Sequence, residues 1–363
     1  MASELEEKTE RLQQMLEGEK LGGVLLNAQH NFAWLTGGGS NGIDLSRENG
    51  AASLLVRTDG KRFVLASNIE MSRMLAEEIS ANDFEPVEYR WQDEKASGSF
   101  VVNKAKVLLS GEIAMDYAIE SRIASCRYQL TSDEIDRYRS LGHDAGTAVQ
   151  RVIDKLMPGE TELEIAEKMR HGLASDGMTS VVTLVAADER ISQYRHPIPT
   201  ANRWNKTLLL VTCAKRKGLI ASLSRIICLG EVPDELKRKT DAAAYVNACL
   251  TGATLPGATG AELYMAAANA YAEKGFADEI DRHHQGGAAG YKTREWVAHP
   301  QSNETVQMDQ AFAWNPSIIG TKVEETCITI ANGVEVITAS PDFPHITTVV
   351  DGREFSSPGI LSL

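Results

Sequence analysis

The sequence has few of the features that mark a nucleic-acid-binding, membrane or secreted protein. Its 363 residues carry a net charge of −13 and no basic stripe interleaved with aromatic side chains, so a nucleic-acid-binding surface is not expected. Its longest apolar stretches, such as residues 207–213, are far shorter than the ~20 residues of a membrane-spanning helix. The N-terminal segment is charged and has no apolar core, so we expect no secretory signal. Neither nucleic acid nor a membrane is therefore an expected partner.

Cysteine is scarce, and its spacing favours no disulfide framework. The chain has five cysteines, an odd number, and no CxxC or CxxH pattern. Cys213, Cys228 and Cys327 lie in apolar, strand-like runs, where cysteine usually acts as a small buried hydrophobe. A catalytic thiol would need electropositive and accessible surroundings, and the structural interpretation is preferred. Scattered reduced thiols predict a cytoplasmic protein.

The length and composition are those of a globular protein with two domains. The chain is 43% hydrophobic and 24% charged, which is sufficient for a full core. Strand and helix patterns alternate over the first ~125 residues, which favours a small α/β domain. Thr131 or Ser132 can then cap a long helix that runs to about residue 156. We place an N-terminal domain at 1–128 and a C-terminal domain at 129–363.

The C-terminal part contains an internal repeat. The segment MPGETELE at residues 157–164 recurs as LPGATGAE at residues 255–262. In each copy, Pro-Gly ends one helix and threonine caps the next, and a β-rich stretch follows. The half-repeats span about 131–230 and 231–345. Two copies of helix–helix–sheet predict an α+β domain with pseudo-two-fold symmetry and a cleft between the halves.

A series of short segments resembles one family over nearly the whole chain. These segments are LGGVLL (21–26), NFAWLTG (31–37), LTSDEI (130–135), HPIPT (196–200), VTCAKRKGLIASLSR (211–225), QGGAAG (285–290), WNP (314–316) and GTKVEET (320–326). Their order and spacing are similar to those of the creatinase, aminopeptidase P and methionine aminopeptidase family. The resemblance implies a pita-bread fold for the C-terminal domain, preceded by a smaller creatinase-type N-terminal α/β domain. It also implies a homodimer.

The resemblance fails at the metal ligands. Most members hold two divalent metals with two Asp, one His and two Glu, whereas the matching positions here are Val211, Ser222, Gly287, Asn315 and Glu324. Carboxylates and neutral imidazoles bind divalent metals because they supply charge and lone pairs. One glutamate cannot offset the repulsion between two adjacent dications, so we expect neither a two-metal mechanism nor any cofactor. A single ion held by His283, His284 and Glu324 is a less favoured alternative.

His196 is the candidate acid/base. In the family this histidine lies beside the reaction centre, and in creatinase it moves protons without metal. An ordinary imidazole titrates at about pH 6.5, so it can take and give a proton near neutrality. Glu324 is the second catalytic candidate. As a buried carboxylate it needs a cationic partner, which could be a substrate group, Arg225 or Lys322.

Further side chains are candidates for holding a substrate. Neighbouring residues on a strand face opposite sides, so at most one of His283 and His284 should face the site, and we prefer His284. Asn315 can donate and accept hydrogen bonds where a metal-bridging glutamate is usual. A carboxylate could be bound by a tyrosine hydroxyl or by arginine guanidinium groups. The candidates for this role are Tyr194, Arg195, Arg203 and Arg294, and Arg225 is a further substrate-binding candidate.

These residues lead to a preferred function and to alternatives. The preferred hypothesis is a metal-independent, creatinase-like hydrolase that cleaves a C–N bond of a small cationic or zwitterionic substrate. His196 moves protons, Glu324 holds the cation, and His284 and Asn315 orient the reacting group. A lyase on the same scaffold remains open, as does a non-catalytic pseudopeptidase that binds a small ligand or a protein. An Xaa-Pro peptidase that binds metal through Asp188, Glu189 or Asp281 is a further alternative.

Overall fold

The N-terminal unit is built on one mixed sheet. The computed structural model describes residues 3–340 and 342–363, and its contacts divide the chain after Arg127, one residue before the predicted boundary. Within the first unit the strand order is β4-β3-β2-β1-β5. The strands are β1 (Gly23–Ala28), β2 (Asn49–Arg57), β3 (Arg62–Ser67), β4 (Glu85–Tyr89) and β5 (Ile113–Met115). β1, β2 and β3 pair antiparallel, whereas β4 and β5 add as parallel edge strands.

Helices accompany this sheet in alternation with the strands, as the sequence predicts. They are α1 (Glu4–Glu19), α2 (Gln29–Leu35), α3 (Met71–Arg73) with the π-helical η1 (Met74–Glu78), α4 (Trp91–Ala96), α5 (Phe100–Lys106), the 3-10 helix η2 (Asp116–Ala118) and α6 (Glu120–Arg127). α1 begins at a capping box in which Ser3 and Glu6 satisfy each other's backbone N–H groups. The unit is therefore the small α/β domain that the sequence indicates.

The second unit, from Tyr128 onward, carries the repeat. Its first half consists of α7 (Ser132–Ile153), α8 (Glu162–Ala174), β6 (Thr179–Ala187), α9 (Arg190–Gln193), β7 (Thr207–Arg216) and β8 (Leu219–Cys228). Its second half begins with α10 (Asp234–Ala253), α11 (Gly260–Glu273), η3 (Ala277–Asp281), β9 (Gly286–Ala289) and β10 (Trp296–Val297). It continues with β11 (Ala311–Trp314), β12 (Ser317–Ile318), β13 (Thr321–Lys322), β14 (Glu325–Ile330) and β15 (Gly333–Val336). The last strands are β16 (His345–Val350), β17 (Arg353–Pro358) and β18 (Ile360–Ser362).

The repeated Pro-Gly-x-Thr segments fold alike. Thr161 caps α8 through a capping box with Glu164, and Thr259 caps α11 through a capping box with Glu262. Each cap threonine also forms an isolated β-bridge, to Arg203 in the first half and to Thr305 in the second. Identical local chemistry at equivalent points supports the predicted pseudo-two-fold arrangement.

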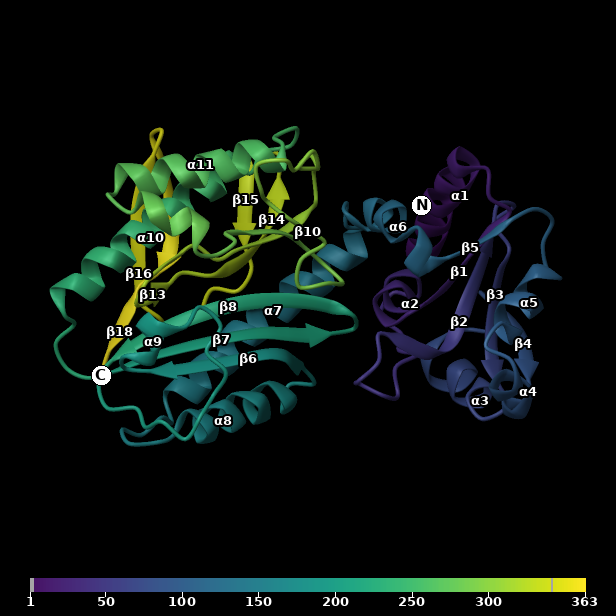
Figure 1. Cartoon of the computed structure of the whole chain (residues 1–363), viewed down its shortest axis with the longest axis horizontal. Helices are drawn as coiled ribbons and strands as arrows, with labels where there is room; N and C mark the ends of the chain where they lie inside the picture. Colours follow the sequence, from purple (N-terminus) through teal and green to yellow (C-terminus); the bar gives the residue numbers. More distant parts are fainter. Residues whose placement is uncertain (1–2, 341) are drawn as a thin grey trace. The chain divides into compact units, whose positions relative to one another are not determined.

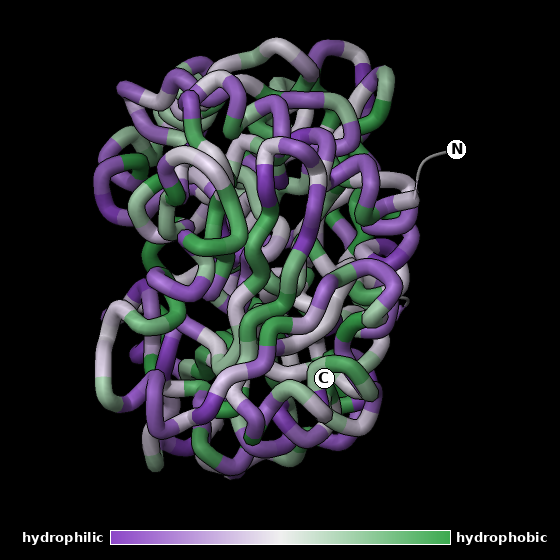
Figure 2. Tube along the Cα trace, turned by 90° about the vertical axis from the view of Figure 1, so that its right-hand side faces the viewer, coloured by the Kyte–Doolittle hydropathy of each residue, from purple (hydrophilic) through white to green (hydrophobic). Residues whose placement is uncertain are grey.

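Two sheets meet in the interior of this unit. One has the order β18-β8-β7-β6 and the other β10-β9-β11-β14-β15, and Figure 1 shows them between the helices of the two halves. β8 contacts the segment that leads into β14: the Ser224 N–H donates to the Glu324 carbonyl, and the Ser222 N–H donates to Thr326 Oγ1 at 2.7 Å. Figure 2 shows that several extended runs of the Cα trace are largely hydrophobic, whereas many turns are hydrophilic. Among the described residues, no helix is long and apolar enough to cross a membrane.

Candidate active site

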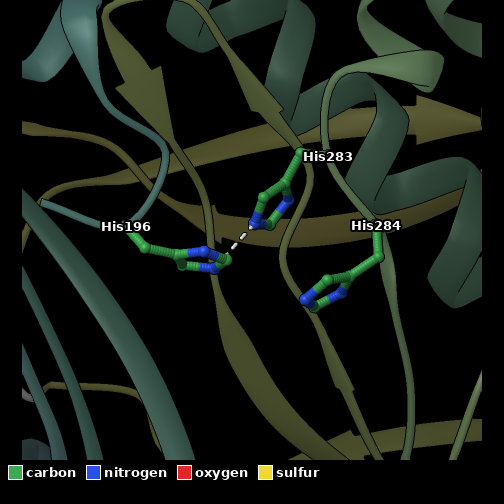
Figure 3. Close-up of side chains that lie close together, drawn as sticks. All are labelled: His196, His283 and His284. Atoms are coloured by element: carbon green, nitrogen blue, oxygen red, sulfur yellow. Dashed lines mark hydrogen bonds between the residues drawn. The ribbon is translucent and has the colours of Figure 1, made fainter.

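Three histidines from two distant segments form the centre of the site. His196 lies in the loop after α9, whereas His283 and His284 lie between η3 and β9. His196 Nε2 is 3.2 Å from His283 Nε2, and the rings of His283 and His284 stack with their centroids 4.5 Å apart (Figure 3). One ring nitrogen from each of the three lies within 4.8 Å of the others. We call His196, His283 and His284 the histidine cluster.

The prediction that only one of the tandem histidines faces the site was wrong. It assumed a strand, in which neighbours point to opposite sides. His283 and His284 instead lie in irregular backbone just before β9, where this alternation does not apply. Both rings therefore join His196, and the direct hydrogen-bonding neighbour of His196 is His283 rather than the preferred His284.

The three imidazoles are held in their neutral form. Burial lowers the pKa of His283 to about 2, and nearby Lys322 adds to the shift. The groups packed against the ring of His284 displace part of its water and lower its pKa to about 4, and Arg294 and Lys322 add to that shift. The pKa of His196 is also lowered, first because surrounding groups displace water from its ring and then by Lys322, against an opposing effect of Glu324. A neutral imidazole has one N–H donor and one lone pair, so each ring can both give and accept a hydrogen bond at neutral pH.

These lowered pKa values predict a loss of stability in mild acid. In the unfolded chain each histidine titrates at about pH 6.5, so below that pH the unfolded state binds more protons than the folded state. The histidine contribution is therefore fully present above pH 6.5 and is lost as the pH falls, toward 4 for His284 and toward about 2 for His283. We expect the free energy of unfolding, measured with urea, to fall over this window. His283→Gln should make the fall shallower, and parallel curves for variant and wild type would contradict this explanation.

Glu324 is buried between two protein cations. Its Oε1 is 3.2 Å from a terminal nitrogen of Arg294, and its Oε2 is 3.2 Å from Lys322 Nζ. Burial by itself raises the pKa of this carboxyl, but Lys322 and Arg294 outweigh burial and hold the pKa below its ordinary value. The predicted role of Glu324 as the anchor for a substrate cation is therefore wrong, because both of its oxygens already have protein partners. We call Lys322, Glu324 and Arg294 the ion triad.

Arg225 likewise forms its ion pair and hydrogen bonds with groups of the protein. Its guanidinium is 1% exposed and lies 2.9 Å from Glu325, which is 5% exposed. It also donates to Ser340 Oγ at 3.1 Å and to the Thr338 carbonyl at 2.8 Å. The assignment of Arg225 to substrate binding was wrong, since a guanidinium with this many partners has no donor directed to a ligand. Its role is to neutralise a buried carboxylate.

The other predicted binding residues differ in availability. Arg195 forms an ion pair with Glu279 and donates to Ser317 Oγ, so its charge is already balanced. Tyr194 is 52% exposed and lies against the Arg190 guanidinium. The Asn315 N–H donates to the Gln285 carbonyl, and its buried Oδ1 has no partner among the described residues. Of these three, Asn315 has a buried polar atom that a ligand could use.

The sequence indicates the contact between Lys322 and Glu324 but not the contact between Arg294 and Glu324. Lys322 and Glu324 are two apart in an extended segment, and that spacing places both side chains on one face. The pairing with Lys322 was one of the alternatives that the sequence left open. Arg294 comes from the loop between β9 and β10, and nothing in its local sequence indicates that it reaches Glu324.

The residues at the family's metal positions do not fit two divalent ions. Val211 has no ligand atom, and the Ser222 hydroxyl donates to Cys213 Sγ at 3.2 Å. Gly287 has no side chain, and the backbone leaves no room for one, because a Cβ added at this position would lie 2.1 Å from the Trp296 carbonyl oxygen. The single carboxylate of Glu324 is shared by an ammonium and a guanidinium. Such a donor set cannot offset the charge of adjacent dications.

The acids named for an alternative metal site lie elsewhere. Asp188 accepts hydrogen bonds from the backbone N–H groups of residues 205–207 and so fixes a turn. Glu189 precedes α9, and Asp281 ends η3. Within the described parts of the chain, the histidine cluster alone gathers three or more ligand atoms of the kind that bind metals. Those ligands are all neutral, and the cations of the ion triad repel an incoming dication.

The structure combines a small N-terminal α/β unit with a pita-bread unit that carries the histidine cluster. The chain belongs to metallopeptidase family M24, whose sequence model matches residues 136–338. The model of the creatinase/prolidase N-terminal domain matches residues 8–155. The family and the fold class expected from the sequence are thereby confirmed. Membership places the chain in a family of peptidase-type hydrolases.

Solved structures share this architecture along almost the whole chain. The Xaa-Pro dipeptidase from Bacillus anthracis is 18% identical with a TM-score of 0.76, and the match covers 99% of this chain and 100% of that one. The prolidase from Pyrococcus horikoshii OT3 is 19% identical with a TM-score of 0.76, covering 92% and 98%. The N-terminal domain of the FACT complex subunit SPT16 from chickpea (Cicer arietinum) is 11% identical with a TM-score of 0.70, covering 93% and 97%. At these identities the shared property is the fold. None of the curated proteins matches the sequence.

Proposed function

We propose that this protein is a metal-independent hydrolase that cleaves a C–N bond of a small zwitterionic or anionic molecule. The observation that carries the proposal is the contact between two neutral imidazoles, His196 and His283, beside the ion triad. The family supplies the reaction class, and the donor set at the former metal positions favours chemistry without two metals. As part of the same proposal, the protein acts as a homodimer in the cytoplasm.

The two histidines have different parts in this mechanism. If His196 Nε2–H donates to His283 Nε2, the Nδ1 of His196 keeps its lone pair and can accept a proton from water. The hydroxide so formed attacks the electrophilic carbon and makes a C–O bond. The His196 imidazolium then returns the proton to the leaving nitrogen as the C–N bond breaks. His283, with a pKa of about 2, does not compete for that proton and serves to orient His196.

Asn315 is the proposed orienting group for the substrate. It is 3% exposed, and its unpartnered Oδ1 can accept a hydrogen bond from an N–H of the ligand. His284, stacked on His283 and exposed, is placed to contact the same molecule. A lyase would use the same base on a proton attached to carbon, and it would release an unsaturated product instead of adding water.

A direct test is a screen for hydrolysis in the presence of a chelator. Small amides, ureas and amidines that carry a carboxylate are incubated with the protein and EDTA, and the products are followed by NMR. Turnover that persists in EDTA and is lost in His196→Asn supports the proposal. Turnover that appears only after Mn²⁺ or Co²⁺ is added would instead favour a metal-dependent Xaa-Pro peptidase. The similar dipeptidase and prolidase structures are examples of that alternative.

A non-catalytic binding protein is the second candidate. The chickpea structure shows that the fold also occurs in a subunit of the FACT complex. The loss of the family's ligands at Val211 and Gly287 also favours this candidate, since a binding module does not need them. Absence of turnover across the screen, together with binding that is unchanged in His196→Asn, would favour it over the hydrolase.

A further inference from the structure

The ion triad carries one positive charge for which the described residues show no second carboxylate partner. Lys322 and Arg294 share the single carboxylate of Glu324, with one contact of 3.2 Å each. The nearby Arg195 is already paired with Glu279, and the histidine cluster is neutral. The group charges therefore add up to a surplus of one cation beside the histidine cluster.

These cations are almost completely removed from water. The side chain of Lys322 is 5% exposed, that of Arg294 is 11% exposed, and that of Glu324 is 3% exposed. A buried charge is costly unless an opposite charge or hydrogen bonds compensate it. One carboxylate balances only one of the two positive charges. A bound anion would therefore balance the remaining charge of the triad.

Buried polar atoms without partners gather around the same residues. Among the described residues, these atoms include Arg294 Nε and His283 Nδ1. Asn315 Oδ1 is another, and the pairing of Trp314 with Glu325 places Asn315 next to Glu324 across the β11–β14 ladder. Native structures satisfy nearly all buried polar groups. Donors and acceptors left open beside a surplus charge indicate a small polar ligand.

We propose that Lys322 and Arg294 bind the carboxylate of a small anionic substrate and thereby hold its scissile bond beside His196. The inference deepens the proposed function, and it reverses the sign of the ligand charge that Glu324 alone had suggested. A guanidinium presents a planar fork and an ammonium a point charge, and both bind carboxylates through charge-assisted hydrogen bonds. Glu324 is then a positioning residue that holds the two cations together.

An anionic ligand and a cationic ligand predict opposite effects of replacing Glu324. Glu324→Gln removes the only negative charge of the triad, so binding of a carboxylate ligand should tighten by about tenfold. Lys322→Met and Arg294→Met should each weaken that binding by about tenfold or more. If Glu324 instead held a substrate cation, Glu324→Gln would weaken binding.

The experiment is a ligand-observed NMR titration with a matched pair of probes, N-acetylglycine and N-acetylglycinamide. They differ in one charge, so preference for the acid measures recognition of the carboxylate. Lys237→Met is the control, because Lys237 is exposed and its loss changes the net charge equally. Thermal unfolding checks that each variant is folded. If Lys322→Met does not fold, Glu324→Gln alone decides the direction.

The expected result is a preference for the acid that increases in Glu324→Gln and is unchanged in Lys237→Met. Equal binding of acid and amide, or weaker binding of the acid by Glu324→Gln, would overturn the inference. Binding is measured without turnover, and His196→Asn should keep it. If the protein does not hydrolyse a C–N bond, the preference for the acid should still be observed. The experiment therefore distinguishes a failure of the proposed hydrolysis from a failure of the proposed carboxylate binding.

Discussion

Replacing Arg225 with methionine is expected to lower the free energy of unfolding of the second unit by about 3–5 kcal/mol. The substitution leaves Glu325 as a buried carboxylate, 5% exposed, without its guanidinium partner at 2.9 Å. It also removes the donors to Ser340 Oγ and the Thr338 carbonyl. Burial already raises the pKa of Glu325 against the opposing effect of Arg225, so the loss of this partner raises that pKa further. Urea unfolding measures the change.

The matched control is the double variant Arg225→Met, Glu325→Gln. Removing both charges takes away the unpaired buried carboxylate, so the double variant should recover much of the lost stability. A single variant within about 1 kcal/mol of wild type would show that Arg225 is not a structural residue and would reopen its assignment to substrate binding.

Replacing His196 with asparagine is expected to lower kcat by about 10²–10⁴-fold with the fold retained, which is the usual contribution of a general acid/base. Asparagine keeps a polar group near the position of the ring but cannot take a proton at neutral pH. Steady-state kinetics on the substrate found in the screen, with circular dichroism of both proteins, measures the effect.

Substitution of His284 provides the comparison. His284 lies in the same cluster but is not the hydrogen-bonded neighbour of His283, and its pKa is about 4. His284→Asn should therefore raise KM more than it lowers kcat. Activity of His196→Asn near that of wild type would show that another group is the base.

The sequence predicted those parts of the molecule that local patterns determine. The repeated Pro-Gly-x-Thr segments predicted equivalent helix starts, because a capping threonine and the acid three residues later act over a single turn. The order of short motifs predicted the fold, and it singled out His196, which the structure brings beside His283. The residue types at the positions matched to the family's metal ligands could also be read from the sequence, whereas chemistry without two metals stays a prediction.

The partners of the charged residues were harder to predict because they depend on long-range packing. Arg225 and Arg294 were both plausible ligands in the sequence, yet one neutralises Glu325 and the other reaches Glu324 from a separate loop. The tandem histidines were misassigned because their backbone is irregular and not a strand. In each case the local sequence gives the residue type, and the tertiary structure gives its partner.

The central claim is that this member of family M24 does not use a dinuclear metal centre, and its metal content tests that claim most directly. The protein, purified without a tag and dialysed mildly, is analysed by elemental mass spectrometry. We expect less than about 0.1 equivalent of Mn, Co, Fe or Zn per chain, because the remaining donors are neutral histidines and one carboxylate shared by two cations. About one or two tightly held equivalents per chain would contradict the account and would make a metallopeptidase the leading assignment.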